Sequence, residues 1–219
     1  MAINVAIDGP AGAGKSTIAK AVAAKKGYVY VDTGAMYRAM ALYFIRAGVS
    51  ADDEQTIASK VNDIKVSIRY EDGKQHVILN DEDVTGLIRT EEVGNMASAT
   101  SVYGPVRAKL VALQQELAKS TDVIMDGRDI GTVVLPNADV KIFLTASVEC
   151  RAKRRFDELK AKGEAPDFDK IAKDIEERDY RDSHREISPL KQAEDAILVD
   201  SSDMSIDEVV STIIDYCDK

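Results

Sequence analysis

Eight residues near the start of the chain have the types and the spacing of a loop that binds phosphate. They are Gly9-Pro10-Ala11-Gly12-Ala13-Gly14-Lys15-Ser16, which fit the pattern G-x-x-x-x-G-K-[ST]. In such a loop the lysine reaches the β- and γ-phosphates, and the hydroxyl ligates Mg²⁺. We therefore predict a nucleoside triphosphate site from Gly9 to Thr17, with Lys15 as its cation and Ser16 as a metal ligand.

The segments on both sides of the loop support this interpretation. Residues 3–7 form a short β-type run, and residues 16–26 have the composition of a helix rich in Ala and Lys. The loop would then lie at a helix N-terminus, where free N–H groups and the helix dipole favour an anion. An ordinary glycine-rich turn is the alternative, and the flanking strand and helix argue against it.

A second charged stretch follows a predicted buried strand at residues 123–125. It reads Asp126-Gly127-Arg128-Asp129. A surface Arg–Asp pair is the alternative, but three charged residues within four positions at the end of a core strand favour a site. Asp126 resembles the carboxylate that accompanies phosphate loops and lies near Mg²⁺, which it would approach through water. Arg128 would bind a phosphate.

A third stretch, Asp32-Thr33-Gly34, lies between a predicted strand at residues 28–31 and a predicted helix at residues 35–45. Open α/β sheets bind their ligands at the carboxyl ends of strands. Asp32 and Thr33 could equally cap the helix, and the sequence leaves both roles open. Tyr37 and Arg38 lie one turn into this helix, where a lone arginine is usually a surface charge.

The middle of the chain interrupts the alternation of strands and helices. Residues 65–70 alternate strictly between polar and apolar types, Asp72-Gly73 is typical of a tight turn, and residues 75–79 follow as a second strand. We therefore predict a β-hairpin in an inserted antiparallel lobe at about residues 63–90.

Two predicted helices follow this lobe, at residues 91–101 and 106–119, and Tyr103-Gly104-Pro105 separates them. An apolar stripe marks the second helix. Ser98 lies on the first helix and Arg107 on the second. Taken alone, both would be surface residues.

The last third of the chain is dense in cations. Predicted helices at residues 149–162 and 167–182 carry most of them, and Arg185 follows directly. A charge run is usually a solvated face, but positive charge concentrated against a net charge of -9 suggests a polyanionic ligand. The cations of the first helix are Arg151, Lys153, Arg154, Arg155, Lys160 and Lys162, and those of the second include Arg178 and Arg181.

Composition limits the classes of function. The chain has 219 residues, of which 45% are hydrophobic and 31% charged, and this suits one soluble α/β domain with insertions. Its acidity disfavours binding to a nucleic-acid backbone, and no apolar run is long enough for a transmembrane helix. The first residues enter a strand at once, so we expect no signal peptide. Cys150 and Cys217 lack metal spacing and are expected to be free thiols in the cytoplasm.

The sequence holds more charged groups than the binding of one triphosphate needs. They are a phosphate loop, a strand-end carboxylate and arginines in several other segments. They indicate two phosphorylated substrates. A monophosphate acceptor has a second pKa of about 6, so its oxygen is largely anionic at neutral pH and needs no strong general base. Cations then hold the two anions in line and neutralise the moving phosphoryl group. The sequence offers no Ser/His/Asp or Cys/His arrangement that competes with this account.

Four segments together resemble the bacterial cytidylate kinase family. They are the phosphate loop, Asp32-Thr33-Gly34-Ala35-Met36-Tyr37-Arg38, Asp126-Gly127-Arg128-Asp129-Ile130-Gly131-Thr132 and Glu177-Arg178-Asp179-Tyr180-Arg181-Asp182. The resemblance covers essentially the whole chain. It implies a P-loop α/β three-layer sandwich with a mostly parallel central sheet, a small antiparallel β insertion that binds a nucleoside monophosphate, and a short helical lid. It also implies transfer of the γ-phosphoryl group of ATP to CMP or dCMP with Mg²⁺.

The resemblance further implies roles for individual residues. Those that would hold the acceptor phosphate are Arg38, Arg128 and Arg185, and those that would read the cytosine are Ser98, Arg107 and Asp129. Arg178 and Asp182 would contact the ribose, Thr33 and Tyr37 would complete the substrate site, and Arg154 would contact ATP and the transition-state charge. The catalytic set is then Lys15, Asp126, Arg128, Arg154 and Arg185.

We expect a single, monomeric P-loop kinase domain over residues 1–219. Its core would lie at about residues 1–34, 104–147 and 183–219, its monophosphate-binding region at about 35–103 and its lid at about 148–182. The alternatives are a kinase for UMP or a small metabolite and, in another class, a GTP-binding switch protein. The switch protein would need an Asn-Lys-x-Asp string, which is absent, and Asp83-Val84-Thr85-Gly86 matches D-x-x-G without the buried strand that should precede it.

Overall fold

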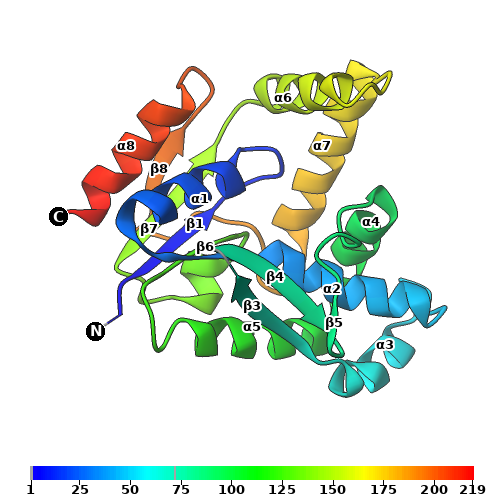
Figure 1. The fold of residues 1–219 in the computed structure, drawn as a ribbon. Coiled ribbons are helices and arrows are strands. Elements are labelled where there is room, and N and C mark those ends of the chain that lie inside the picture. The colour runs from blue at the N-terminus through cyan, green and yellow to red at the C-terminus, as the bar shows by residue number, and fades with distance from the viewer. Residues whose placement is uncertain (1, 72) are drawn as a thin grey trace. The chain divides into compact units, whose positions relative to one another are not determined.

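Strand β1 (Asn4–Asp8) lies in the middle of a five-stranded sheet in the computed structural model, which describes residues 2–71 and 73–219. The strand order is β2-β6-β1-β7-β8, and β1 runs parallel to both of its neighbours (Figure 1). The remaining strands are β2 (Val29–Asp32), β6 (Val123–Gly127), β7 (Val140–Thr145) and β8 (Ile197–Asp200). Parallel strands end at one edge of the sheet, so the phosphate loop after β1 and the charged stretch on β6 emerge together.

The chain divides into two compact units. Unit 1 comprises the residues up to Tyr30 together with Thr121–Lys219, and unit 2 comprises Val31–Ser120. Helix α5 (Gly104–Leu117) therefore belongs to unit 2, whereas the sequence grouped residues 104–147 with the core. The functional boundaries of core, monophosphate-binding region and lid remain a prediction.

The core of unit 1 lies between the sheet and two helices, α1 (Lys15–Lys26) and α8 (Ile206–Cys217). Apolar residues alternate little along β1, β6 and β7 because both faces of these strands are covered. Gly9 is required where β1 enters the loop, since a Cβ atom there would lie 1.9 Å from the carbonyl oxygen of Leu144. The buried residues that form this core include Val5, Ile7, Ile18, Val22, Ile124, Ile142, Leu144 and Ile213.

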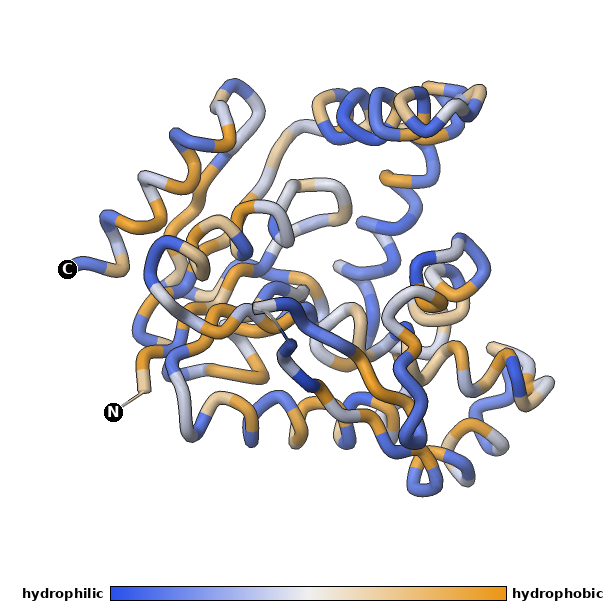
Figure 2. Tube along the Cα trace, in the orientation of Figure 1, coloured by the Kyte–Doolittle hydropathy of each residue, from blue (hydrophilic) through white to orange (hydrophobic). Residues whose placement is uncertain are grey.

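Two further helices of unit 1 pack on one another, α6 (Val148–Ala161) and α7 (Phe168–His184). The rings of Phe156 and Phe168 meet edge to face between them, with centroids 6.1 Å apart. The side chain of Asp167 caps α7 by accepting a hydrogen bond from the backbone N–H of Lys170. Figure 2 shows both helices as mostly hydrophilic, so few of their side chains contribute to a core.

Unit 2 combines a helical cluster with a small antiparallel sheet. The predicted hairpin is present as β3 (Val66–Glu71) and β4 (Lys74–Leu79), and a short third strand, β5 (Glu82–Asp83), was not predicted. Gly73 has a φ of 72°, as a tight turn requires, while Asp72 lies outside the described residues. The helices are α2 (Thr33–Arg46), α3 (Glu54–Lys60), α4 (Glu91–Thr100) and α5.

The predicted break between the two helices, at Tyr103-Gly104-Pro105, is wrong at its C-terminal side, because α5 begins at Gly104. Tyr103 is the N-cap residue of α5, and Gly104 and Pro105 belong to the first turn of the helix. Proline is favoured there because its missing N–H is not needed at that point of a helix. In the described part of the chain, none of the helices combines the length and apolar character needed to cross a membrane.

Candidate active site

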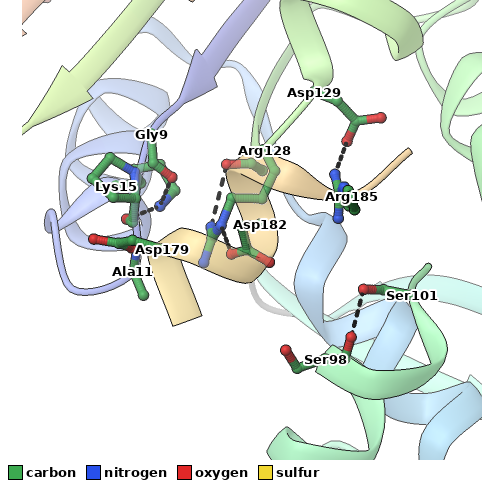
Figure 3. Close-up of polar contacts among 12 residues, drawn as sticks. Gly9, Ala11, Lys15, Ser98, Ser101, Arg128, Asp129, Asp179, Asp182 and Arg185 are labelled. Atoms are coloured by element: carbon green, nitrogen blue, oxygen red, sulfur yellow. Dashed lines mark hydrogen bonds and ion pairs between the residues drawn. The ribbon is translucent and has the colours of Figure 1, made fainter. Parts of the chain in front are cut away.

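The ammonium group of Lys15 is folded back onto the phosphate loop. Its Nζ donates hydrogen bonds to the carbonyl oxygens of Gly9 and Pro10, at 2.8 and 2.7 Å (Figure 3). Burial, reinforced by the positive charge of Arg128, lowers the pKa of Lys15 well below its ordinary value, while Asp126 and Asp8 oppose the shift. This buried cation lies at the start of α1, where the first N–H groups have no intrahelical acceptor. The loop therefore offers an anion both a cation and backbone donors.

A hydroxyl and a carboxylate meet beside the loop. The Oγ of Ser16 donates to Oδ2 of Asp126 at 2.8 Å, and the hydroxyl of Tyr30 donates to Oδ1 of the same carboxylate at 2.8 Å. Each carboxylate oxygen of Asp126 thus accepts a hydrogen bond from a different hydroxyl group, and the two bonds fix the orientation of the carboxylate. The sequence predicted the pair Ser16 and Asp126, but it missed Tyr30, because nothing in the pattern of β2 marks that tyrosine as a partner of β6.

Two guanidinium–carboxylate pairs follow the end of β6. The Nε of Arg128 donates to Oδ2 of Asp182 at 2.8 Å, and Arg185 forms an ion pair with Asp129 at 3.8 Å (Figure 3). Burial by itself would raise the pKa of Asp182, but the charge and hydrogen bond of Arg128, with help from Arg178 and Arg185, lower it. Five residues predicted from separate segments, Arg128, Asp129, Arg178, Asp182 and Arg185, therefore interact in one electrostatic cluster.

Arg154 lies beside the phosphate loop and lines a cavity of about 330 Å³. Its Nη2 donates to the carbonyl oxygen of Ser201 at 2.7 Å, and its Nη1 lies 3.9 Å from the position that a Cβ of Gly14 would occupy. Both apolar and hydroxyl-bearing side chains line the cavity. Its lining includes Gly14, Thr17, Ile18, Ser201, Met204, Ser205, Ile206 and Val209.

In unit 2, Asp32 both caps a helix and binds two arginines. Its Oδ1 accepts the backbone N–H of Ala35 at 2.8 Å, and Oδ2 accepts Nη2 of Arg89 at 2.7 Å and of Arg38 at 3.3 Å. Burial by itself would raise the pKa of Asp32, but the charges of Arg38 and Arg89 outweigh it and lower the pKa. The cap is therefore present, and the adjacent Thr33 is buried. Arg89 was missed because it lies in a segment without any local signal.

Arg107 is buried, with 3% of its surface exposed, so the reading of this residue alone as a surface charge was wrong. Its guanidinium lies 5.6 Å from the centre of the Tyr37 ring, and its Nη1 donates to the carbonyl oxygen of Ser101 at 3.1 Å. Ser98 is half-buried on α4, and its carbonyl oxygen accepts the hydroxyl of Ser101. Unit 2 therefore brings Tyr37 and Arg107 together from two different helices.

The comparison with protein families decides the assignment. A family model described as cytidylate kinase matches residues 5–219. The chain belongs to the cytidylate kinase family. The resemblance seen in the sequence is confirmed, as is the predicted fold class of a mostly parallel sheet with a small antiparallel sheet.

Curated relatives agree with the cytidylate kinase assignment over nearly the whole chain. A cytidylate kinase of Caldicellulosiruptor bescii is 53% identical over 213 residues, which cover 97% of this chain and 94% of the relative. One of Leuconostoc mesenteroides is 54% identical over 210 residues, with 96% and 94% covered. A solved structure of an uncharacterized protein from Eubacterium ventriosum covers 100% of this chain and 99% of that one, with a TM-score of 0.54 and 14% identity, and shares the fold.

A buried carboxylate next to the loop was missed by the sequence analysis. Asp8, the last residue of β1, accepts the backbone N–H groups of Ile130 and Gly131 at 2.8 and 2.7 Å. Burial raises the pKa of Asp8 from 3.8 to about 6, and these two hydrogen bonds offset it only in part. Asp8 thereby fixes the turn that follows Arg128 and Asp129. No local pattern in the sequence predicts these hydrogen bonds, because Ile130 and Gly131 lie more than a hundred residues from Asp8.

The raised pKa of Asp8 predicts a specific dependence of stability on pH. Between about pH 4 and 6 the folded chain holds a proton on Asp8 that the unfolded chain has lost, so the stability from this group falls as the pH rises. A rise in pKa from 3.8 to about 6 corresponds to about 3 kcal/mol. We expect urea unfolding to show that the free energy of unfolding of wild type falls by about this amount between pH 4 and 7, relative to that of Asp8→Asn. The variant has no carboxyl proton to lose at this position.

A carboxylate with the opposite shift provides the control. Hydrogen bonds from Thr56 lower the pKa of the exposed Asp53, so Asp53→Asn should change the pH dependence in the opposite direction. A constant difference between wild type and Asp8→Asn across the range would contradict the prediction.

Proposed function

We propose that this chain transfers the γ-phosphoryl group of ATP to CMP or dCMP, giving ADP and CDP or dCDP. The observation that carries the proposal is the cytidylate kinase match over residues 5–219, in a chain whose Lys15, Ser16 and Asp126 are all in place around the phosphate loop. These three side chains argue against a non-catalytic binding module. We further propose a monomer that works in the cytoplasm.

ATP would occupy the loop and the adjoining cavity. The N–H groups at the start of α1 and the ammonium of Lys15 suit its phosphates, and the cavity beside Gly14 suits its base. Apolar side chains such as Met204 and Val209 would pack on the base, while Arg154 closes one side. The residues proposed to contact ATP are therefore Gly9 to Thr17 and Arg154.

The oxygen atoms of Ser16 and Asp126 fit a hard cation such as Mg²⁺. They already lie within hydrogen-bond distance of each other, and hydroxyl and carboxylate oxygens are ligands that Mg²⁺ prefers. Ser16 would ligate the ion directly and Asp126 through water. Within residues 2–71 and 73–219, no group of three or more His, Cys, Asp or Glu side chains is arranged so that it could hold a metal ion, and phosphate oxygens would supply most of the ligands. When bound, the ion neutralises charge on the β- and γ-phosphates.

Replacing Asp126 with asparagine should weaken the response to Mg²⁺. The variant loses the negative charge beside Ser16, so we expect half-maximal activation at roughly tenfold more Mg²⁺ and a kcat lower by about 10²-fold. Initial rates over a Mg²⁺ series at fixed ATP measure both. Asp215→Asn on the exposed side of α8 is the matched control. An activation curve that coincides with wild type would exclude Asp126 from the metal site.

The acceptor would be held largely by arginines. Arg38, Arg128 and Arg185 would bind its phosphate. Ser98, Arg107 and Asp129 would read the cytosine, Arg178 and Asp182 would contact the ribose, and Thr33 and Tyr37 would line the site. Three of these arginines already have a partner in their own unit that orients the guanidinium before substrate binds. They are Arg128 with Asp182, Arg38 with Asp32, and Arg107 with the ring of Tyr37.

The reaction would be a direct in-line displacement. An oxygen of the CMP phosphate, already anionic near neutral pH, attacks the γ-phosphorus as the bond to the β-phosphate oxygen of ATP breaks. Lys15 and Arg128 stabilise the charge that spreads over the transferred group. No covalent intermediate with the protein is needed. Closure of α6 and α7, the proposed lid, would exclude water and limit hydrolysis of ATP.

An acceptor panel tests the proposal. ADP release from ATP and Mg²⁺ is measured with CMP, dCMP, UMP and GMP and without acceptor, and we expect CMP or dCMP to give the highest kcat/KM. A preference for UMP would overturn the assignment of CMP. Hydrolysis of GTP without any dependence on an acceptor would favour a switch protein instead.

A further inference from the structure

Two side chains from α6 and α7 hold a single residue of the phosphate loop by both of its polar backbone groups. Arg151 donates through Nη1 to the carbonyl oxygen of Ala11 at 2.9 Å, and Asp179 accepts the N–H of Ala11 at 3.3 Å. The two side chains also bind each other, at 2.6 Å between Nη1 and Oδ2. Figure 3 shows Asp179 next to Ala11 and Lys15.

Arg151 of this pair is buried, and its partner Asp179 is half-buried. Arg151 is 4% exposed, and its Nε donates to the carbonyl oxygen of Ala146 at 2.9 Å. A guanidinium in such a place needs a carboxylate partner, because an unpaired buried charge is costly. Helix α6 also touches the loop directly, since a Cβ on Gly12 would lie 3.2 Å from the Cβ of Arg151. The contact is therefore fixed by packing as well as by hydrogen bonds.

The position of Ala11 controls where the rest of the loop lies. The residues that follow it, from Gly12 to Ser16, present the backbone N–H groups and the side chains that would contact the donor phosphates. A displacement of the order of 1 Å in such groups can cost about 10²-fold in rate. We propose that Arg151 and Asp179 are positioning residues that set the conformation of the phosphate loop for the donor. The inference rests on the proposed function only in taking that donor to be ATP.

Two roles of Asp179 predict opposite changes in the affinity for ATP when its carboxylate is removed. One role is purely electrostatic, and the other is the positioning of the phosphate loop. A carboxylate close to a phosphate site repels the anion, so electrostatics alone would make Asp179→Asn bind ATP more tightly. Positioning predicts weaker binding, because the asparagine leaves Arg151 buried without a carboxylate and holds Ala11 less firmly. The sign of the change therefore separates the two explanations.

The experiment compares Asp179→Asn with Asp174→Asn, a matched change at an exposed position on the same helix. We expect Asp179→Asn to raise KM for ATP about tenfold while KM for CMP stays within about twofold, and Asp174→Asn to change neither. Arg151→Lys keeps the charge but loses the planar fork that reaches Ala11 and Asp179 together, so it should raise KM for ATP as well. An unchanged or lowered KM for ATP in Asp179→Asn would overturn the inference.

Calorimetric binding of a non-hydrolysable ATP analogue with Mg²⁺ provides a second readout that needs no acceptor. Asp179→Asn and Arg151→Lys should bind it about tenfold more weakly than wild type, with circular dichroism confirming that each variant is folded. Equal affinity in folded variants would overturn the inference. A wild-type protein that binds the analogue but does not phosphorylate CMP would overturn the proposed function, while the affinities of the variants would still decide the role of Arg151 and Asp179.

Discussion

Replacing Arg128 with alanine is expected to lower kcat by about 10³-fold, because arginines that stabilise a transferring phosphoryl group contribute effects of this size. The guanidinium is held by its hydrogen bond to Asp182 and follows directly after the strand that bears Asp126, so its charge is oriented before the substrates bind. Steady-state kinetics with CMP as the varied substrate measure the change, and KM for CMP should rise at the same time.

The fold should survive this substitution. Asp182 is buried and loses one partner, but the charges of Arg178 and Arg185 also act on it, so we expect a loss of about 1–3 kcal/mol rather than unfolding. Arg155→Ala provides a matched control, since Arg155 is exposed on α6 and pairs only weakly with Glu158 at 2.9 Å. Near-normal turnover in folded Arg128→Ala would remove Arg128 from the site.

The sequence predicted the elements that bear local signals. The loop from Gly9 to Ser16 needs glycine at backbone positions such as Gly12 and Gly14, whose φ angles are 77° and 88°. Asp126 follows a short apolar run whose length favours a buried strand, and the structure shows that strand as β6. Strand, loop and helix were therefore readable in order, and so was the antiparallel hairpin of β3 and β4, which has a period of two.

The remaining part of the site depends on partners that lie far apart in the chain. Asp8 reads as the last residue of a strand, and only the parallel packing of β1 and β6 brings Ile130 and Gly131 to it. Arg151 and Asp179 are unremarkable within two charged helices until the fold places both against Ala11. Local pattern gives helix and strand, whereas tertiary contact decides which of many similar charges is buried and paired.

Three buried carboxylates of unit 1 show why the identity of the partner matters. Asp8 receives hydrogen bonds from neutral backbone donors, and its pKa is raised because these bonds do not offset burial. Asp182 receives a guanidinium, and its pKa is lowered although it is also buried. Asp126 accepts hydrogen bonds from the hydroxyls of Ser16 and Tyr30, two donors that a cation could replace or join. The carboxylates of β1, α7 and β6 are thus suited to bracing a turn, orienting an arginine and approaching a metal, respectively.

Replacing Lys15 with methionine should separate activity from stability. The side chain is 6% exposed and its pKa is lowered by burial and by Arg128, so its charge costs free energy in the folded chain until an anion joins it. Methionine keeps the length of the stem and removes the charge, at the cost of the hydrogen bonds to Gly9 and Pro10. We expect kcat/KM for ATP to fall by about 10³-fold, while the free energy of unfolding stays within about 1 kcal/mol of wild type.

Urea unfolding and steady-state kinetics on the same preparation measure both effects. Lys25→Met, at an exposed position on the same helix, should change neither by more than the scatter between preparations. A large loss of stability in Lys15→Met together with only a modest loss of activity would mean that the lysine serves to brace the loop through Gly9 and Pro10. The opposite result, a stable protein with almost no turnover, would show that the folded chain tolerates a buried, destabilised cation at this position because the phosphates of the donor complete its environment.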